Sequence, residues 1–85
     1  MRFLVISRQK PGLNDTQKQG LYQAVTAFHT NPGAVKVEAD YALADRSGSY
    51  SVVDVPDRAT LDAKMAAFAP FVTTEVLEVM PAAQG

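Results

Sequence analysis

The sequence predicts an α+β domain with the element order βαββαβ, and three observations carry this prediction. Two apolar runs, residues 3–7 and 50–55, have the aromatic and β-branched composition of buried strands. Two other segments, residues 15–30 and 58–69, repeat large apolar residues at helical spacing. Two further segments mix apolar with polar residues, as strands at the edges of a sheet do. Two interleaved βαβ units of this kind form a four-stranded antiparallel sheet with both helices on one face.

The first strand lies near the start of the chain and leads through a loop into the first helix. Residues 3–7 form a run that is apolar up to its last residue, Ser7, which predicts a central strand covered on both faces. A loop is indicated by Pro11 and Gly12, and Asn14 or Asp15 is placed to cap the helix.

The first helix has its apolar residues on one side. Leu21, Val25 and Phe28 recur at i, i+4 and i+7, so this side should pack on the sheet. The helix should end by about Thr30, because the Asn-Pro-Gly sequence at residues 31–33 removes a backbone donor and supplies a turn.

The second strand is predicted at residues 34–43, where apolar and charged residues alternate. The apolar positions, which should all face one way, are Val35, Val37, Ala39, Tyr41 and Leu43. The charged positions, which should face the other way, are Lys36, Glu38 and Asp40. This alternation is typical of a half-exposed edge strand. A polar turn then leads into the next strand as a hairpin.

The strand at residues 50–55 is the second central strand, since it is apolar on both faces. Pro56 ends it, and Asp57 can accept hydrogen bonds from the first free amides of the helix at 58–69. The buried side of that helix is predicted to consist of Leu61, Met65 and Phe68. The last strand, about residues 74–80, carries several polar residues and is predicted to be the other edge.

The composition predicts one small domain over residues 1–81, followed by a mobile tail at residues 82–85. The 85 residues include no cysteine, so neither a disulfide framework nor a thiolate metal site is expected. A chain this short buries a small share of its surface, and oligomerisation is the remaining common means of stabilisation.

The charge pattern argues against nucleic acid and membranes as partners. Eight basic and nine acidic residues give a net charge of −1 without a basic run. The apolar runs are too short for a membrane span or the core of a signal peptide, so a cytoplasmic protein is predicted.

The two central strands also predict the oligomeric state. Both helices cover one face of the sheet, and the chain has no further element for the other face. Because the central strands are apolar on both faces, we expect a second copy to pack sheet to sheet as a symmetric homodimer.

The second half of the chain resembles a known family. The run from Tyr50 to Val55, a helix containing Leu61, and a strand ending in Glu78-Val79-Met80-Pro81 are similar to the muconolactone isomerases and related small uncharacterised domains. The resemblance implies the ferredoxin-like fold of the dimeric α/β-barrel superfamily. That superfamily includes isomerases, cofactor-free monooxygenases, polyketide cyclases and haem proteins, so the resemblance implies a fold and not one reaction.

One departure from the family bears on function. The relatives carry Trp followed by Arg or His near the end of the second strand, where this chain has Tyr41 followed by Ala42. The aromatic residue is replaced by another, and the basic group is missing. Chemistry that depends on that group does not carry over to this chain.

Sites in the superfamily usually lie between the sheet and the helices, which directs attention to His29 and Tyr22. His29 is the only histidine, and histidine titrates near neutral pH. Both residues lie at the border of the apolar side of the first helix, about 10 Å apart, so they could contact opposite ends of one small ligand. The alternative is that both are boundary residues with a buried ring and a solvated polar end.

Three residues of the hairpin are further candidates. A phenol of Tyr41 or Tyr50 in an apolar pocket can donate a hydrogen bond to a developing enolate oxygen, whereas the alternative is a packed aromatic pair. Asp54 is an unexpected polar residue in a central strand and is a candidate general base. The alternative for Asp54 is a position at the solvated end of the strand.

Ser7 and Arg8, at the end of the first strand, are placed to hold an acid group, although an ordinary solvated loop arginine is the alternative. One histidine, no cysteine and no carboxylate cluster predict no metal site. The scattered glycines form no phosphate-binding loop, so no nucleotide cofactor is expected.

These observations favour an enzyme without metal or nucleotide cofactor that acts on a small organic molecule in secondary or aromatic metabolism. The reaction class is proton transfer by general acid–base catalysis, as in an isomerase, cyclase or lyase, with His29, Tyr50 and Asp54 as catalytic candidates. Alternatives are a non-catalytic dimeric module for ligand binding or assembly, and a cofactor-free monooxygenase. A space filled solidly by Leu21, Phe28, Met65 and Phe68 would exclude the enzyme.

Overall fold

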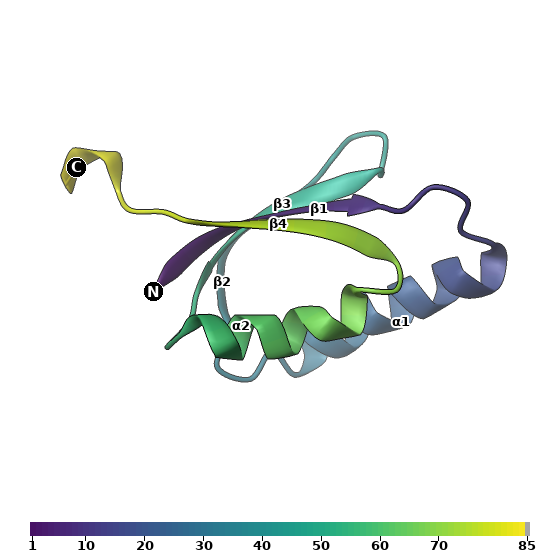
Figure 1. Ribbon diagram of the computed structural model, residues 1–85, viewed down its shortest axis with the longest axis horizontal. Helices are drawn as coiled ribbons and strands as arrows, with labels where there is room; N and C mark the ends of the chain where they lie inside the picture. Colours follow the sequence, from purple (N-terminus) through teal and green to yellow (C-terminus); the bar gives the residue numbers. More distant parts are fainter. Residues whose placement is uncertain (85) are drawn as a thin grey trace.

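The computed structural model describes residues 1–84 and contains four strands and two α-helices in the predicted order. The elements are β1 (Arg2–Gln9), α1 (Asp15–Thr30), β2 (Lys36–Ala42), β3 (Gly48–Asp54), α2 (Arg58–Met65), the 3₁₀ turn η1 (Ala66–Phe68), β4 (Val72–Glu78) and the 3₁₀ turn η2 (Ala82–Gln84). The chain after β4 runs away from the body of the domain (Figure 1). The mobility of this tail stays a prediction, and Gly85 lies outside the described residues.

The sheet has the order β2-β3-β1-β4 with every neighbouring pair antiparallel. Figure 1 shows α1 and α2 on the same face of this sheet. The ferredoxin-like βαββαβ fold is therefore confirmed, with the first and third strands central and the second and fourth at the edges. We call the face that carries the helices the helix face and the opposite one the open face.

Both helices begin at predicted caps, α1 at Asn14 rather than at the alternative Asp15, and α2 at Asp57. The Asn14 side chain accepts a hydrogen bond from the Gln17 amide at 2.8 Å, and the Gln17 side chain accepts one from the Asn14 amide at 2.9 Å. This reciprocal pair is a capping box. Helix α1 ends at Thr30, as expected from the Asn-Pro-Gly sequence, and Gly33 has a positive φ of 64°. Helix α2 keeps α geometry only to Met65, after which η1 completes the predicted helical segment.

The core lies at one end of the helix face. Its buried side chains come from the strands, the segments beside them and α2, and they are Phe3, Val5, Val35, Val53, Val55 and Leu61. Leu61 has no exposed surface at all. No residue of α1 is buried, although Phe28 packs against the core while half-buried. Helix α1 therefore adds no residue to the buried core, and it leaves room between itself and the sheet.

The predicted alternation of β2 is wrong beyond Val37. The pairing of β2 with β3 shifts by one residue between Val37 and Ala39, so Ala39 pairs with Val52 and Asp40 pairs with Ser51. An extra residue of this kind is a β-bulge, and every side chain after it changes face. Asp40 consequently lies on the helix face, where an apolar residue was expected.

The Asp57 cap gives the fold a dependence on pH. Its carboxylate accepts hydrogen bonds from the amide and the hydroxyl of Thr60, both at 2.8 Å. These bonds hold the pKa of Asp57 below its ordinary value. A carboxyl with a lowered pKa stabilises the fold above its unfolded-state pKa, and this contribution disappears as the pH falls through the folded-state pKa.

Asp57→Asn is accordingly expected to flatten the acid limb of the stability curve. Asparagine keeps the cap without a titrating group, so stability near pH 7 should change little. Between pH 7 and about pH 3 the urea midpoint should fall less for Asp57→Asn than for the wild type. Parallel pH curves for the two proteins would contradict this role.

Candidate functional site

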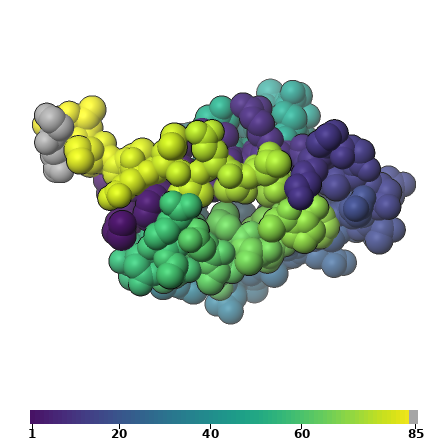
Figure 2. Space-filling model, viewed as in Figure 1, coloured from purple at the N-terminus to yellow at the C-terminus, as the bar shows by residue number. Residues whose placement is uncertain are grey.

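A cavity of about 630 Å³ lies between α1 and the helix face of the sheet. Its volume falls within the range of small-molecule sites, roughly 300–1,000 Å³. The four residues that would have filled a closed core, Leu21, Phe28, Met65 and Phe68, line it instead. Figure 2 shows the surface hollowed between β4 and the segment formed by α2 and η1.

The cavity changes from apolar to polar along the central strands. At the end near the core its wall is formed by Val5, Val37 and Val53. Toward the start of β3, Ser51 comes two residues before Val53, and Ser49 comes two residues before Ser51. Ser49 pairs with Ser7 on β1, and Ser7 lines the cavity too. Since side chains two apart in a strand share a face, these three hydroxyls point into the same space.

His29 and Asp40 meet on the wall of this cavity. The Nε2 atom of His29 lies 3.8 Å from Oδ2 of Asp40, within ion-pair range but longer than a hydrogen bond. The hydroxyl of Ser51 donates a hydrogen bond of 2.9 Å to Oδ1 of the same carboxylate. The ring of His29 stands edge-on to Phe28, with centroids 5.8 Å apart. A histidine, a carboxylate within ion-pair range of it and a hydroxyl that donates a hydrogen bond to the carboxylate are thus brought together from α1, β2 and β3.

The turn between β2 and β3 forms the far end of the cavity. Arg46 and Gly48 both line the space. A Cβ atom at Gly48 would run into the carbonyl oxygen of Ser7, so only glycine allows β3 to approach β1 this closely. Arg46 has a positive φ of 63°. Ala42, where the relatives have a basic residue, also lines the cavity.

The structure places three of the predicted site residues in the cavity wall, namely Ser7, Tyr22 and His29. Tyr22 is largely exposed at the rim. The catalytic or binding roles of these residues stay predictions.

The other predicted site residues lie outside the cavity, on the open face or at its border. Tyr41 pairs with Tyr50 across the hairpin, and the Arg8 guanidinium lies 3.4 Å from the Tyr50 hydroxyl as a weak donor. Tyr41 is 72% exposed. These three residues form a surface group that does not meet His29, because neighbouring residues of a strand point to opposite faces.

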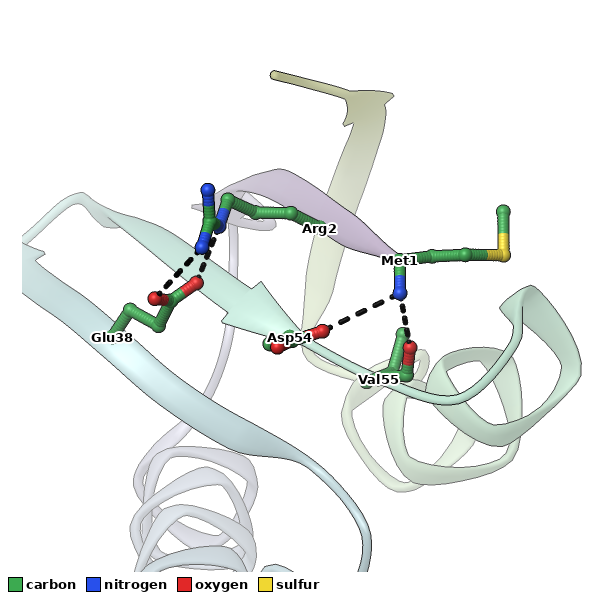
Figure 3. A network of polar contacts seen from close by, with 5 residues as sticks. All are labelled: Met1, Arg2, Glu38, Asp54 and Val55. Atoms are coloured by element: carbon green, nitrogen blue, oxygen red, sulfur yellow. Dashed lines mark hydrogen bonds and ion pairs between the residues drawn. The ribbon is translucent and has the colours of Figure 1, made fainter. Parts of the chain in front are cut away.

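Asp54 lies at the end of β3 in a structural network (Figure 3). The N-terminal amine of Met1 lies 3.4 Å from the Asp54 carboxylate and donates to the carbonyl of Val55 at 2.7 Å. Beside it, Arg2 donates two hydrogen bonds to Glu38, of 2.6 and 3.2 Å, which raise the pKa of the guanidinium. These contacts tie the start of β1 to β2 and β3, and Asp54 does not line the cavity.

Sequence reasoning missed Asp40, Arg46, Ser49 and Ser51. The two serines had a signal, because they alternate with larger residues along a strand and so mark one small polar face. Asp40 had no such signal in the sequence, because the face of the sheet on which it lies depends on the β-bulge. The positive φ of Arg46 was equally hidden, since the glycine two residues later was the natural candidate for that conformation.

Residues 1–84 contain no group of three or more side chains able to hold a metal ion. In the same part of the chain, neither helix has the length and apolar character needed to cross a membrane.

Comparisons with solved structures confirm the fold. The 5-chloro-2-hydroxyhydroquinone dehydrochlorinase of Burkholderia phenoliruptrix, solved with 2,5-dihydroxybenzoquinone, superposes with a TM-score of 0.71 at 13% identity, over 99% of this chain and 98% of that chain. Muconolactone isomerase gives a TM-score of 0.65 at 21% identity, over 96% of this chain and 93% of that chain. An antibiotic biosynthesis monooxygenase gives 0.54 at 17% identity, over 95% of this chain and 100% of that chain.

At these identities the similarity is one of fold alone, and it bears out the resemblance to the muconolactone isomerases at that level. A search of curated protein sequences finds no match. A family model described as a domain of unknown function, DUF3303, matches residues 1–85, and the chain therefore belongs to this family.

Proposed function

We propose that this protein is a cofactor-independent enzyme that moves a proton on a small organic molecule, as an isomerase, cyclase or lyase does. The observation that carries the proposal is the pairing of His29 with Asp40 on the wall of the cavity. Histidine is the residue most often used for general acid–base catalysis near neutral pH.

In the proposed mechanism the neutral imidazole of His29 removes a proton from a carbon next to a carbonyl group. The Asp40 carboxylate stabilises the imidazolium that forms, and its hydrogen bond from Ser51 keeps the carboxylate in place. The imidazole nitrogen that does not face Asp40 takes the proton. Return of the proton to another carbon of the same molecule gives an isomer, so atoms and charge balance.

The oxyanion left on the substrate needs hydrogen-bond donors. Ser7 and Ser49 face each other on the two central strands and both line the cavity, so their hydroxyls suit this task. The phenol of Tyr22 at the rim is a third donor. The roles predicted for Tyr50 and Asp54 gain no support from this geometry, because both lie outside the cavity.

His29→Gln is expected to lower the rate of proton transfer by about 10² to 10⁴-fold, the usual contribution of a general base. The assay follows deuterium incorporation from D₂O into unsaturated lactones and β-keto acids by NMR. Gln23→Ala, an exposed position on α1, is the control and should leave the rate unchanged. An equal rate in His29→Gln and wild type would contradict the proposal.

A non-catalytic binding module is the second candidate, and one observation favours it. The side chains of His29 and Asp40 are 54% and 40% exposed, whereas catalytic groups act best where water is excluded. Crystals soaked with the same lactones and acids separate the two cases. Occupancy of the cavity without any deuterium exchange would identify a binding module.

We further propose that the protein is a homodimer that packs open face to open face. Leu4, Ile6 and Val52 are half-buried there and Leu77 is exposed, while both helices lie on the other side (Figure 1). Each subunit would keep its own cavity. A cytoplasmic location and the lack of a nucleic-acid partner stay predictions from composition and charge.

A further inference from the structure

Arg46 stands out because it is the only residue other than glycine with a positive φ, 63°, within residues 1–84. Glycine and asparagine adopt this conformation at lower free energy than arginine does. An unfavourable backbone conformation that is retained at a cavity suggests that the side chain has a task there.

The turn itself does not require the arginine side chain. The backbone amide of Arg46 donates to the carbonyl of Leu43 at 2.8 Å, a bond that any residue except proline can make. Its neighbours Asp45 and Ser47 bond to each other, with the amide and hydroxyl of Ser47 both donating to the Asp45 carboxylate. Across the part of the chain that the structure describes, no hydrogen bond or ion pair involves the Arg46 guanidinium.

Arg46 is also distinct in charge among the residues around the cavity. Among the described residues that line the cavity there is one carboxylate, Asp40, and besides His29 no cation other than Arg46. Asp40 pairs with Ser51, whereas Ala42 pairs with Ser49, two residues nearer the turn. Two residues of a strand span about 7 Å, so the backbone of the turn begins at least that far along β2 from the backbone of Asp40. Within residues 1–84 the Arg46 guanidinium forms no ion pair with Asp40, so its charge is available to an anion at the turn.

We propose that Arg46 binds the carboxylate of the ligand at the turn end of the cavity and makes the site selective for small organic monocarboxylates. The guanidinium suits a carboxylate because it donates two parallel hydrogen bonds. Placement of the reacting carbon beside His29 rests on the proposed function, and binding of the acid does not. A compact ring would bridge the turn and the position of Asp40 beside His29, whose backbones lie about 7 Å or more apart along β2.

The test compares two acids with their neutral amides, benzoate with benzamide and cyclohexanecarboxylate with its carboxamide, at pH 7.5. Dissociation constants come from ¹H–¹⁵N NMR titrations. In the wild type at least one acid should bind about 10-fold or more tightly than its amide, the usual value of a hydrogen bond to a charged group. The largest shifts should fall on the turn between β2 and β3 and on α1.

Arg46→Gly should abolish the preference for the acid while the melting temperature stays level or rises, because glycine relieves the backbone strain. Arg46→Lys keeps the positive charge and should retain part of the preference. The proposal is overturned by equal binding of acid and amide in the wild type, by no binding of either, or by a preference that survives in Arg46→Gly.

His29→Gln separates this inference from the proposed function. It should lose deuterium exchange and keep the preference for the acid. An Arg46-dependent preference without any exchange in the wild type would remove the enzyme proposal alone. Exchange that depends on His29, without an acid preference, would remove the role of Arg46 alone.

Discussion

Replacing Val53 by aspartate is expected to leave the chain unfolded. Val53 is 3% exposed and packs in the core with Phe3, Val5 and Leu61. No cationic side chain belongs to this described cluster, so the carboxylate would be buried without a partner. The cost of such a burial is several kcal/mol or more, comparable with the whole stability of a domain, which is about 5–15 kcal/mol. A small domain lies toward the lower end of that range.

Far-ultraviolet circular dichroism and ¹H–¹⁵N NMR spectra measure this outcome. Val53→Asp should give the narrow amide dispersion of an unfolded chain at 25 °C. Val53→Ala, the matched control, removes two methyl groups and should keep the fold at a cost of about 2 kcal/mol. A native spectrum for Val53→Asp would show that a charge at this position does not have to stay buried, which would contradict the expectation.

Val52→Asp is expected to give a folded monomer, whereas the wild type is expected to form the proposed open-face homodimer. Val52 comes directly before Val53 in β3, but it lies on the open face, where it pairs with Leu4 and Ala39. In the free chain this side chain is half-buried, so aspartate there keeps contact with water. In the proposed sheet-to-sheet dimer each subunit would bury one such carboxylate in the interface, and removing these charges from water would prevent association.

Light scattering combined with size-exclusion chromatography gives the mass of each protein. Gln23→Asp adds the same charge on the exposed side of α1 and should stay dimeric. Leu77→Asp, at an exposed position of the open face, is a second test if Val52→Asp does not fold. A monomeric wild type, or dimeric forms of both open-face variants, would rule out this interface.

Much of the fold could be predicted because its signals are local. The cap at Asn14, the stop after Thr30 and the cap at Asp57 follow from a few adjacent residues, and the structure confirms each. The central and edge strands follow from how apolar each run is, which the sheet order confirms. Boundaries were less certain, and β4 begins and ends two residues earlier than expected.

The site was less predictable because it depends on which face each strand residue takes. The strand at 50–55 is apolar on both faces, so its sequence does not indicate on which face of the sheet Tyr50 or Asp54 lies. The structure turns both away from the cavity. His29 was accessible to prediction because it borders a clear helical stripe, whereas Asp40 reaches it only through a shift in strand pairing.

The bulge in β2 has an evolutionary consequence. The bulge takes up the one extra residue, Glu38, so the pairing from Ala39 onward does not depend on it. A one-codon deletion of Glu38 would leave Val37 opposite Val53 and Asp40 opposite Ser51, now in regular alternation and on the same faces as before. Within this fold, β2 can therefore change in length by one residue at the bulge without moving the acid away from His29.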